Sequence, residues 1–178
     1  MRTEQVVRTA LVFGASLLFR FVPFRPPNVE LVLASQMPVA KVYGKTAGFF
    51  FGVLSILAFD LLTGTLGSWS LVTASAYGLL GVFASWYLAS RAGTRYFVYF
   101  AIAGTLFFDA VTGLTVGPLF FGQSFTAALL GQIPFTLMHL LGNIAFALVW
   151  STFLMSFLET KTHTTRVGLP HTAVLPVS

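Results

Sequence analysis

Long runs of apolar residues follow one another along this chain, with only short polar segments between them. The runs occupy residues 6–22, 31–43, 46–62, 70–89, 96–111 and 119–158. A membrane-spanning helix needs about 20 mostly apolar residues, and most of the runs approach or exceed that length. Only 8% of the residues are charged, against roughly 25% in a soluble domain. The sequence therefore predicts an all-α integral membrane protein and excludes an ordinary cytosolic enzyme, a disordered chain and a nucleic-acid-binding protein.

The first two runs need separate treatment. The run at 6–22 follows a basic segment, as a signal peptide would, but no small-residue cleavage site ends it. We therefore expect it to be retained as the first span. The run at 31–43 is short and contains Gln36 and Pro38. Because lipid offers no hydrogen-bond partner, we expect neighbouring helices to shield this run.

The last run is too long for one span at about 1.5 Å per residue. Gly131 and Pro134 offer a break within it. The sequence thus predicts a half-helix at 119–130 and a final span at 132–157. Together with the five earlier runs this makes six transmembrane helices, with the extra half-helix before the last. A full crossing by 119–130 stays open.

The distribution of Lys and Arg predicts the orientation, because these residues collect in cytoplasmic loops. With the N terminus inside, only Arg20 and Arg25 of the ten basic residues lie outside. A full crossing by 119–130 would weaken this asymmetry, so the half-helix is favoured and both termini are cytoplasmic. We predict one transmembrane domain over 1–158 and a flexible cytoplasmic tail over 159–178.

A short sequence occurs twice, as FDLLTG at 59–64 and as FDAVTG at 108–113. Asp60 and Asp109 thereby end two predicted spans on the same, outer side. Such an Asp can simply end a helix, but an acid within a membrane segment is by default a functional group or one with a partner. The predicted charges of the outer side are Arg20, Arg25, Glu30, Asp60 and Asp109.

Polar residues also recur on the final span. Gln132, Thr136, His139 and Asn143 follow at steps of four, three and four, which places them on one helical face. This face must look into the bundle or into a wet cavity. Interhelical hydrogen bonding and a ligand-lining stripe both stay open. Trp69 suits an interfacial anchor or a stacking contact with a ring-shaped ligand.

Small residues recur at steps of four in two places. Ala10 and Gly14 form one pair, and Gly44, Gly48 and Gly52 form the other series. This spacing lets membrane helices approach closely. Internal packing and a surface for another membrane protein are both possible uses of it.

Several kinds of chemistry leave no trace in the sequence. The chain has no Cys, which excludes a disulfide, a thiolate nucleophile and a Cys-based metal site. It also has no nucleotide-binding loop of the Gly-x-x-x-x-Gly-Lys-Ser type, so any energy must come from a partner. We predict no metal site, no resident cofactor and no catalytic residue.

These features occur together in one known family. They are six spans, a short second span after a Pro-rich outer loop, a Gly-rich third span that ends in Asp60, and GQIPF at 131–135. In this combination, residues 6–157 resemble the S component, the substrate-binding membrane subunit, of energy-coupling factor (ECF) transporters.

The resemblance implies that the protein lies in a prokaryotic inner membrane and captures a vitamin or related micronutrient from outside. It would deliver this substrate through a membrane T component and two cytoplasmic ATPases. The first span would dock on the T component through Ala10 and Gly14, where Gly replaces the second Ala of the family's Ala-x-x-x-Ala motif. By position the family's pocket implicates Asn28, Trp69, Asp109, Gln123, Gln132 and His139, and the repeat and the polar stripe add Asp60 and Asn143.

Two other functions stay open. The first is a structural or assembly membrane protein, such as a cell-shape subunit, in which the polar stripe only packs helices. The second is an intramembrane enzyme that uses His139 with Asp109.

Overall fold

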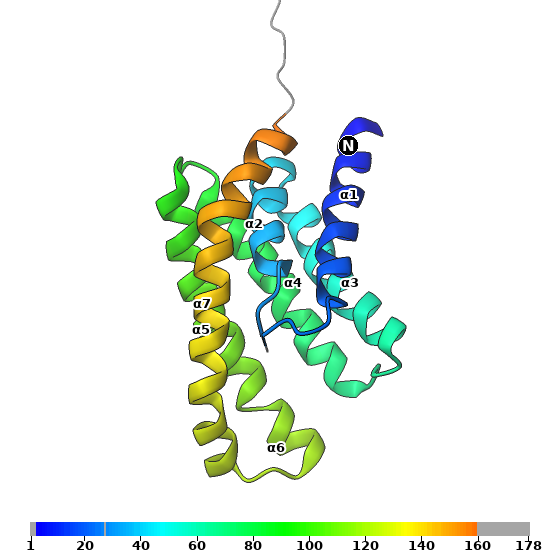
Figure 1. Ribbon diagram of the computed structural model, residues 1–178, viewed down its shortest axis with the longest axis vertical. Helices are drawn as coiled ribbons and strands as arrows, with labels where there is room; N and C mark the ends of the chain where they lie inside the picture. The colour runs from blue at the N-terminus through cyan, green and yellow to red at the C-terminus, as the bar shows by residue number, and fades with distance from the viewer. Residues whose placement is uncertain (1–2, 27, 160–178) are drawn as a thin grey trace, which may run out of the picture.

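The part of the chain that the structure describes is helical throughout. The computed structural model describes residues 3–26 and 28–159, and Figure 1 shows how the helices are arranged. The helices are α1 (Thr3–Arg20), α2 (Val32–Tyr43), α3 (Lys45–Thr63), α4 (Ser68–Leu88), α5 (Thr94–Gly113), α6 (Val116–Phe121) and α7 (Phe125–Leu158). These residues form no strand, so the predicted all-α class is confirmed for them. The predicted tail, apart from Glu159, lies outside the described residues.

Four helical stretches are long and apolar enough to cross a membrane. They are α3, α4, the stretch Thr94–Phe121 that joins α5 and α6, and α7. These stretches confirm the prediction of a membrane protein. The helix α2 is much shorter, with 12 residues. At about 1.5 Å per residue, its length falls well short of the roughly 30 Å hydrocarbon core.

The short helix α2 lies among the other helices, against α3, α4 and α7 (Figure 1). All of its residues from 32 to 40 are buried. The Gln36 Nε2 atom donates to the carbonyl oxygens of Gly48 at 2.9 Å and Tyr77 at 2.6 Å. The polar side chain thus bonds to protein instead of facing lipid. The expectation that neighbouring helices shield this run is confirmed.

The helices α3 and α4 approach closely at glycines. A methyl group added at Gly48 would lie 2.7 Å from the carbonyl oxygen of Gly81, and one added at Gly52 would lie 2.6 Å from that of Tyr77. These glycines therefore serve internal packing. Gly44 differs from them, because it forms the turn between α2 and α3 with φ of 89°.

The predicted division of the last run is wrong. The structure has a short helix before the last long one, but α6 ends at Phe121, and α7 continues from Phe125 to Leu158 through Pro134. The half-helix at 119–130 is therefore not formed as one unit, and the last helix begins seven residues before the predicted 132. Figure 1 shows α7 running along almost the whole length of the molecule.

Local capping explains where the break falls. Gly122 ends α6 in the left-handed region, with φ of 65°, as glycine does after many helices. The Ser124 side chain then accepts a hydrogen bond from the Ala127 N–H at 3.2 Å and caps the N terminus of α7. Pro134 removes only one backbone donor from a helix of 34 residues. The caps therefore decide the boundary, and the proline is accommodated within the helix.

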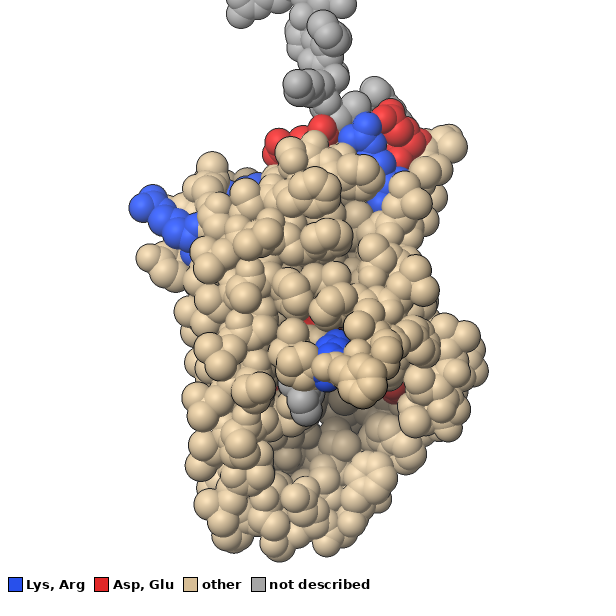
Figure 2. Space-filling model, viewed as in Figure 1, with Lys and Arg blue, Asp and Glu red and all other residues tan. Residues whose placement is uncertain are grey.

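One end of the molecule gathers basic side chains. Arg8 donates to the carbonyl oxygen of Phe157 at 2.7 Å, and Lys41 donates to that of Leu88 at 2.9 Å. The N terminus of α1 and the C termini of α2, α4 and α7 therefore share this end. Figure 2 shows most of the visible basic atoms there. The loop between α1 and α2 lies about half-way down the molecule, and α6 and the start of α7 form the opposite end (Figure 1).

Candidate functional site

A cavity of about 250 Å³ lies beneath the α1–α2 loop, between α3, α4, α5 and α7. Its polar lining consists of Arg20, Arg25, Asn28, Glu30, Asp60, Thr73 and His139. Its aromatic lining consists of Trp69, Tyr77, Phe108 and Phe135. Figure 2 shows the molecule hollowed beneath a basic side chain. The lining thus combines polar and apolar side chains, and polar groups that converge on a concave site beside apolar surface are typical of small-molecule sites.

Two of the charged residues neutralise each other. The Nε atom of Arg20 lies 3.2 Å from Oε2 of Glu30, an ion pair in which Nε makes no hydrogen bond. The guanidinium of Arg20 also lies 3.8 Å from the centre of the Phe59 ring, and its Nη1 donates to the Ser55 carbonyl oxygen at 3.4 Å. The other oxygen of Glu30 accepts a hydrogen bond from the Tyr77 hydroxyl. This network joins α1, the α1–α2 loop, α3 and α4, and stabilises one wall of the cavity.

The other two charged side chains of the lining have only neutral partners among the described residues. Asp60 Oδ2, near the end of α3, accepts a hydrogen bond from the Ser70 hydroxyl in the first turn of α4 at 2.6 Å. Arg25 Nη1, in the α1–α2 loop, donates to the carbonyl oxygen of Val29 at 2.8 Å. In the part of the chain that the structure describes, neither side chain belongs to an ion pair.

Asp109 and His139 form a buried pair across α5 and α7. The distance between Asp109 Oδ1 and His139 Nδ1 is 2.7 Å, and the residues are 1% and 3% exposed. The imidazole stands edge-on to the rings of Phe108 and Phe135, with centroids 5.9 Å away in both cases. With a proton on Nδ1, the neutral ring carries its lone pair on Nε2.

The pair leaves two polar atoms unused. His139 Nε2 and Asp109 Oδ2 have no hydrogen-bond partner among the described residues. Because buried polar groups are almost always hydrogen-bonded, such atoms call for an explanation. His139 lines the cavity, but its Nε2 atom has almost no exposed surface, so a ligand reaches this atom only if a neighbouring side chain moves.

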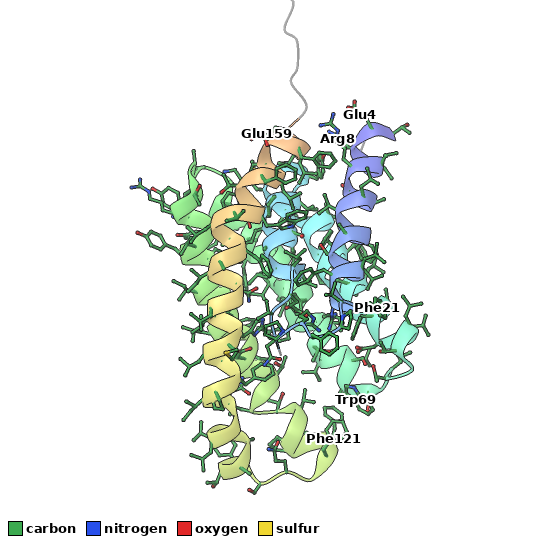
Figure 3. The ribbon with its side chains drawn as sticks, viewed as in Figure 1. Glu4, Arg8, Phe21, Trp69, Phe121 and Glu159 are labelled. Atoms are coloured by element: carbon green, nitrogen blue, oxygen red, sulfur yellow. The ribbon has the colours of Figure 1, made fainter. Side chains whose placement is uncertain are left out.

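Aromatic rings complete the walls. Trp69, in the first turn of α4, packs against Phe121 at the end of α6, with centroids 5.0 Å apart (Figure 3). Tyr77 packs against Phe108 at 4.5 Å. Rings of this kind offer both apolar surface and stacking contacts to a planar ligand.

The structure brings together four of the predicted substrate-binding residues. Asn28, Asp60, Trp69 and His139 all line the cavity. They come from the α1–α2 loop and from α3, α4 and α7. Asp109 lies behind His139 and acts on the cavity only through it. Its role is therefore to position the imidazole.

The other three predicted residues do not line the cavity. Asn143 Nδ2 donates to the hydroxyl of Thr105 at 2.8 Å and so links α7 to α5. Gln132 Nε2 donates to a Thr one turn further along α7 at 3.1 Å. Gln123 lies in the turn after α6. The polar stripe of α7 thus packs helices at Asn143 and faces the cavity at His139.

The aromatic lining other than Trp69 was not predicted. A signal for Tyr77 exists in the sequence, because Trp69, Thr73 and Tyr77 recur every four residues and share one face of α4. Phe135 and His139 are likewise four residues apart on α7. In a chain so rich in aromatic residues, this spacing alone does not separate a cavity wall from ordinary packing.

The predicted docking residues lie on an open surface of α1. Ala10 is exposed, and nothing lies within 4 Å of a methyl group added at Gly14. Ala10 also lines an apolar groove of about 540 Å³ between α1 and α3, together with side chains such as Phe13 and Phe50. Within the described residues, this part of α1 is therefore accessible to another helix.

Among the described residues, no group of three His, Asp or Glu side chains could hold a metal ion. The chain was also compared with known proteins. No protein-family model, curated protein or solved structure matches it.

Proposed function

We propose that this chain is the substrate-binding subunit of an ECF-type importer. It takes up a vitamin or related micronutrient from outside in the cavity beneath the α1–α2 loop, and passes it to a membrane T component driven by two cytoplasmic ATPases. The cavity is the observation that carries the proposal, because Arg25 and Asp60 line it with only one neutral hydrogen-bond partner each. Polar groups in an apolar setting cost free energy unless they are paired, and a bound ligand offsets that cost.

In this proposal six helices cross a prokaryotic inner membrane, and both termini are cytoplasmic. The gathering of Arg8, Lys41 and Arg91 at one end of the molecule supports this orientation, since Lys and Arg collect on the cytoplasmic side. The helix α1, and α2 together with the loop that precedes it, then complete the four long apolar stretches to six spans, since α2 alone is too short to cross. The cavity, toward the other end, is reached from outside.

The open surface of α1 supports a partner in the membrane. Lipid tails are as apolar as the helices, so membrane helices associate mainly through close packing at small residues. Ala10 and Gly14 offer such a surface without a covering helix among the described residues. We assign this surface to the T component.

The binding function is tested on the purified chain in detergent. Native mass spectrometry should find one co-purified small molecule, and a panel of vitamins should contain a compound that raises the melting temperature. A ligand at a hundred times its Kd stabilises by about 2.7 kcal/mol. His139→Gln should reduce this shift. Gln123→Ala, which lies outside the cavity, should leave it unchanged. An empty protein that no vitamin stabilises would contradict the proposal and favour a structural or assembly role.

The Asp109–His139 pair supports a second candidate, an intramembrane enzyme. An Asp that orients His through Nδ1 and leaves Nε2 free occurs in hydrolytic triads. No described hydroxyl is bonded to His139 Nε2, so the nucleophile of such a triad is not in place. Mass spectrometry after incubation distinguishes the two functions. Recovery of an unchanged ligand supports binding, whereas conversion that His139→Gln abolishes would support an enzyme.

A further inference from the structure

The cavity contains two charges that the described part of the protein does not neutralise. Arg20 and Glu30 form an ion pair with each other, and Asp109 does not line the cavity. Arg25 and Asp60 remain. Both line the cavity and both are only half-buried, so a ligand can reach them.

The present partners of these two side chains are neutral. A carbonyl oxygen accepts from Arg25 and a hydroxyl donates to Asp60, each through one hydrogen bond. The guanidinium has five N–H donors, and a carboxylate can accept about four hydrogen bonds, so both retain unused capacity. A carboxylate or another planar anion suits the guanidinium, because two parallel N–H donors can bind it at once. An ammonium or another N–H cation suits Asp60.

The charge balance favours a ligand that carries both signs. A ligand with one anionic and one cationic group would give both Arg25 and Asp60 a partner of opposite charge. A singly charged ligand would pair one of them and leave the other beside apolar walls with less water. An unpaired charge in such a setting is unfavourable.

The aromatic walls and the volume of the cavity further restrict the class of ligand. The lining includes four aromatic side chains, which favour a planar apolar body. The cavity volume, about 250 Å³, lies just below the roughly 300–1,000 Å³ of pockets for drug-sized ligands. The ligand is therefore small.

We propose that the cavity selects a small aromatic zwitterion, whose anionic group binds Arg25, whose cationic group binds Asp60, and whose ring packs on the aromatic lining. This inference rests on the binding function proposed above and specifies its substrate class.

Matched probes test the inference by titration calorimetry on the chain in detergent, freed of small molecules by dialysis. L-Phenylalanine carries both charges side by side, phenethylamine lacks its carboxylate, and hydrocinnamate lacks its ammonium. Para-aminomethylbenzoate carries the charges at opposite ends of its ring, with benzylamine and benzoate as its analogues. At least one zwitterion should bind roughly tenfold or more tightly than both of its analogues, since a hydrogen bond to a charged group is worth about 1.5–3 kcal/mol.

Two variants test which charged group of the ligand each side chain binds. Arg25→Gln should weaken the zwitterion and the carboxylate analogue and leave the amine unchanged. Asp60→Asn should weaken the zwitterion and the amine and leave the carboxylate analogue unchanged. The analogue that each variant still binds shows that the variant is folded. Arg95→Gln removes an exposed charge outside the cavity and should change none of the affinities.

The outcomes separate this inference from the proposed function. The inference would be overturned if each zwitterion bound no more tightly than its analogues, or if no probe bound at all. It would also be overturned if either variant bound the zwitterion with unchanged affinity. A co-purified ligand that is neutral or singly charged would overturn it too, yet would uphold the binding function. A protein that emerges empty and binds neither probes nor vitamins would overturn both.

Discussion

The two aspartates of the repeated sequence meet different surroundings. Asp109 is 1% exposed and bonded to His139, whereas Asp60 is half-buried and bonded to Ser70. Each is followed three residues later by a Thr that bonds back to the carbonyl four residues before it. The local geometry of the repeat is thus kept, and the packing around it decides which Asp can reach a ligand.

The buried Asp109–His139 pair leads to a prediction about stability. His139→Leu removes the donor to Asp109 and leaves a buried carboxylate without it, which should lower the free energy of unfolding by about 3 kcal/mol. The double variant Asp109→Leu, His139→Leu removes both polar groups and should be more stable than His139→Leu alone. Unfolding in detergent, followed by circular dichroism, measures both. A double variant less stable than the single one would contradict the role given to the pair.

Among the elements, α2 is too short to span the hydrocarbon core by itself. Its residues are acceptable in a membrane because α3, α4 and α7 surround them and because Gln36 bonds to backbone carbonyls of α3 and α4. The close contact of α3 with α4 depends on glycines that leave no room for a side chain. The buried residues of the main hydrophobic cluster come chiefly from α2, α4 and α5.

This close contact predicts an effect of a single methyl group. Gly52→Ala would bring the new Cβ within 2.6 Å of the Tyr77 carbonyl oxygen, so the helices must separate, at a cost of about 1–3 kcal/mol. Gly131→Ala is the matched control, since nothing lies within 4 Å of its added methyl group. Thermal unfolding in detergent should show a lower melting temperature for the first variant alone. Equal melting temperatures would contradict the close approach of α3 and α4.

At the scale of the whole molecule, the basic end and the cavity lie toward opposite ends. Arg8 and Glu4 lie at the end that also holds Glu159 (Figure 3). The cavity lies beneath the α1–α2 loop, beside Arg20 at the end of α1 and Arg25 in the loop. This separation matches a protein that meets its substrate on one side of the membrane and its energy source on the other.

The orientation can be tested because the chain has no Cys. Thr65→Cys, in the exposed turn after α3, should react with a membrane-impermeant maleimide in intact cells. Ala92→Cys, in the exposed turn after α4, should react only after the cells are permeabilised. Labelling is read by a mass shift on a gel. The reverse pattern would invert the proposed topology.

The docking surface predicts a variant that separates binding from transport. Gly14→Leu adds bulk where a partner helix would approach and should abolish uptake of the substrate, while its Kd stays unchanged because the cavity is untouched. Leu106→Phe, at an exposed position of α5 away from this surface, should retain uptake. Uptake of labelled substrate in cells and calorimetry on the purified variants give the two readouts. Loss of binding in Gly14→Leu would refute the docking role.

Much of this protein was predictable from its sequence alone. Apolar runs near the length of a membrane span form transmembrane helices, because every backbone group in lipid must find its hydrogen-bond partner within the helix. The all-α class, the membrane character, the shielding of α2 and the approximate helix positions follow from that. The end of α6 was missed because the caps at Gly122 and Ser124 compete with the more conspicuous Pro134.

The cavity could be predicted only in part. The sequence placed the outer charges toward one side of the molecule, but it did not tell which of them pair. The pairing depends on how each helix is rotated about its axis, both for Arg20 with Glu30 and for Asp109 with His139. In helices that are apolar nearly all round, hydrophobic periodicity barely determines that rotation.

The sequence by itself thus determined that this protein lies in a lipid bilayer and that it is helical. It also determined that the charged residues gather toward the two ends of the helices. Each of these follows from the cost of polar groups in lipid. Only the tertiary structure decided that Arg25, Asp60 and His139 would line one cavity, and that among the described residues Arg25 and Asp60 would have no charged partner there. The physical reason is that close packing between helices sets their rotation and depth, and these two variables bring residues from distant segments together.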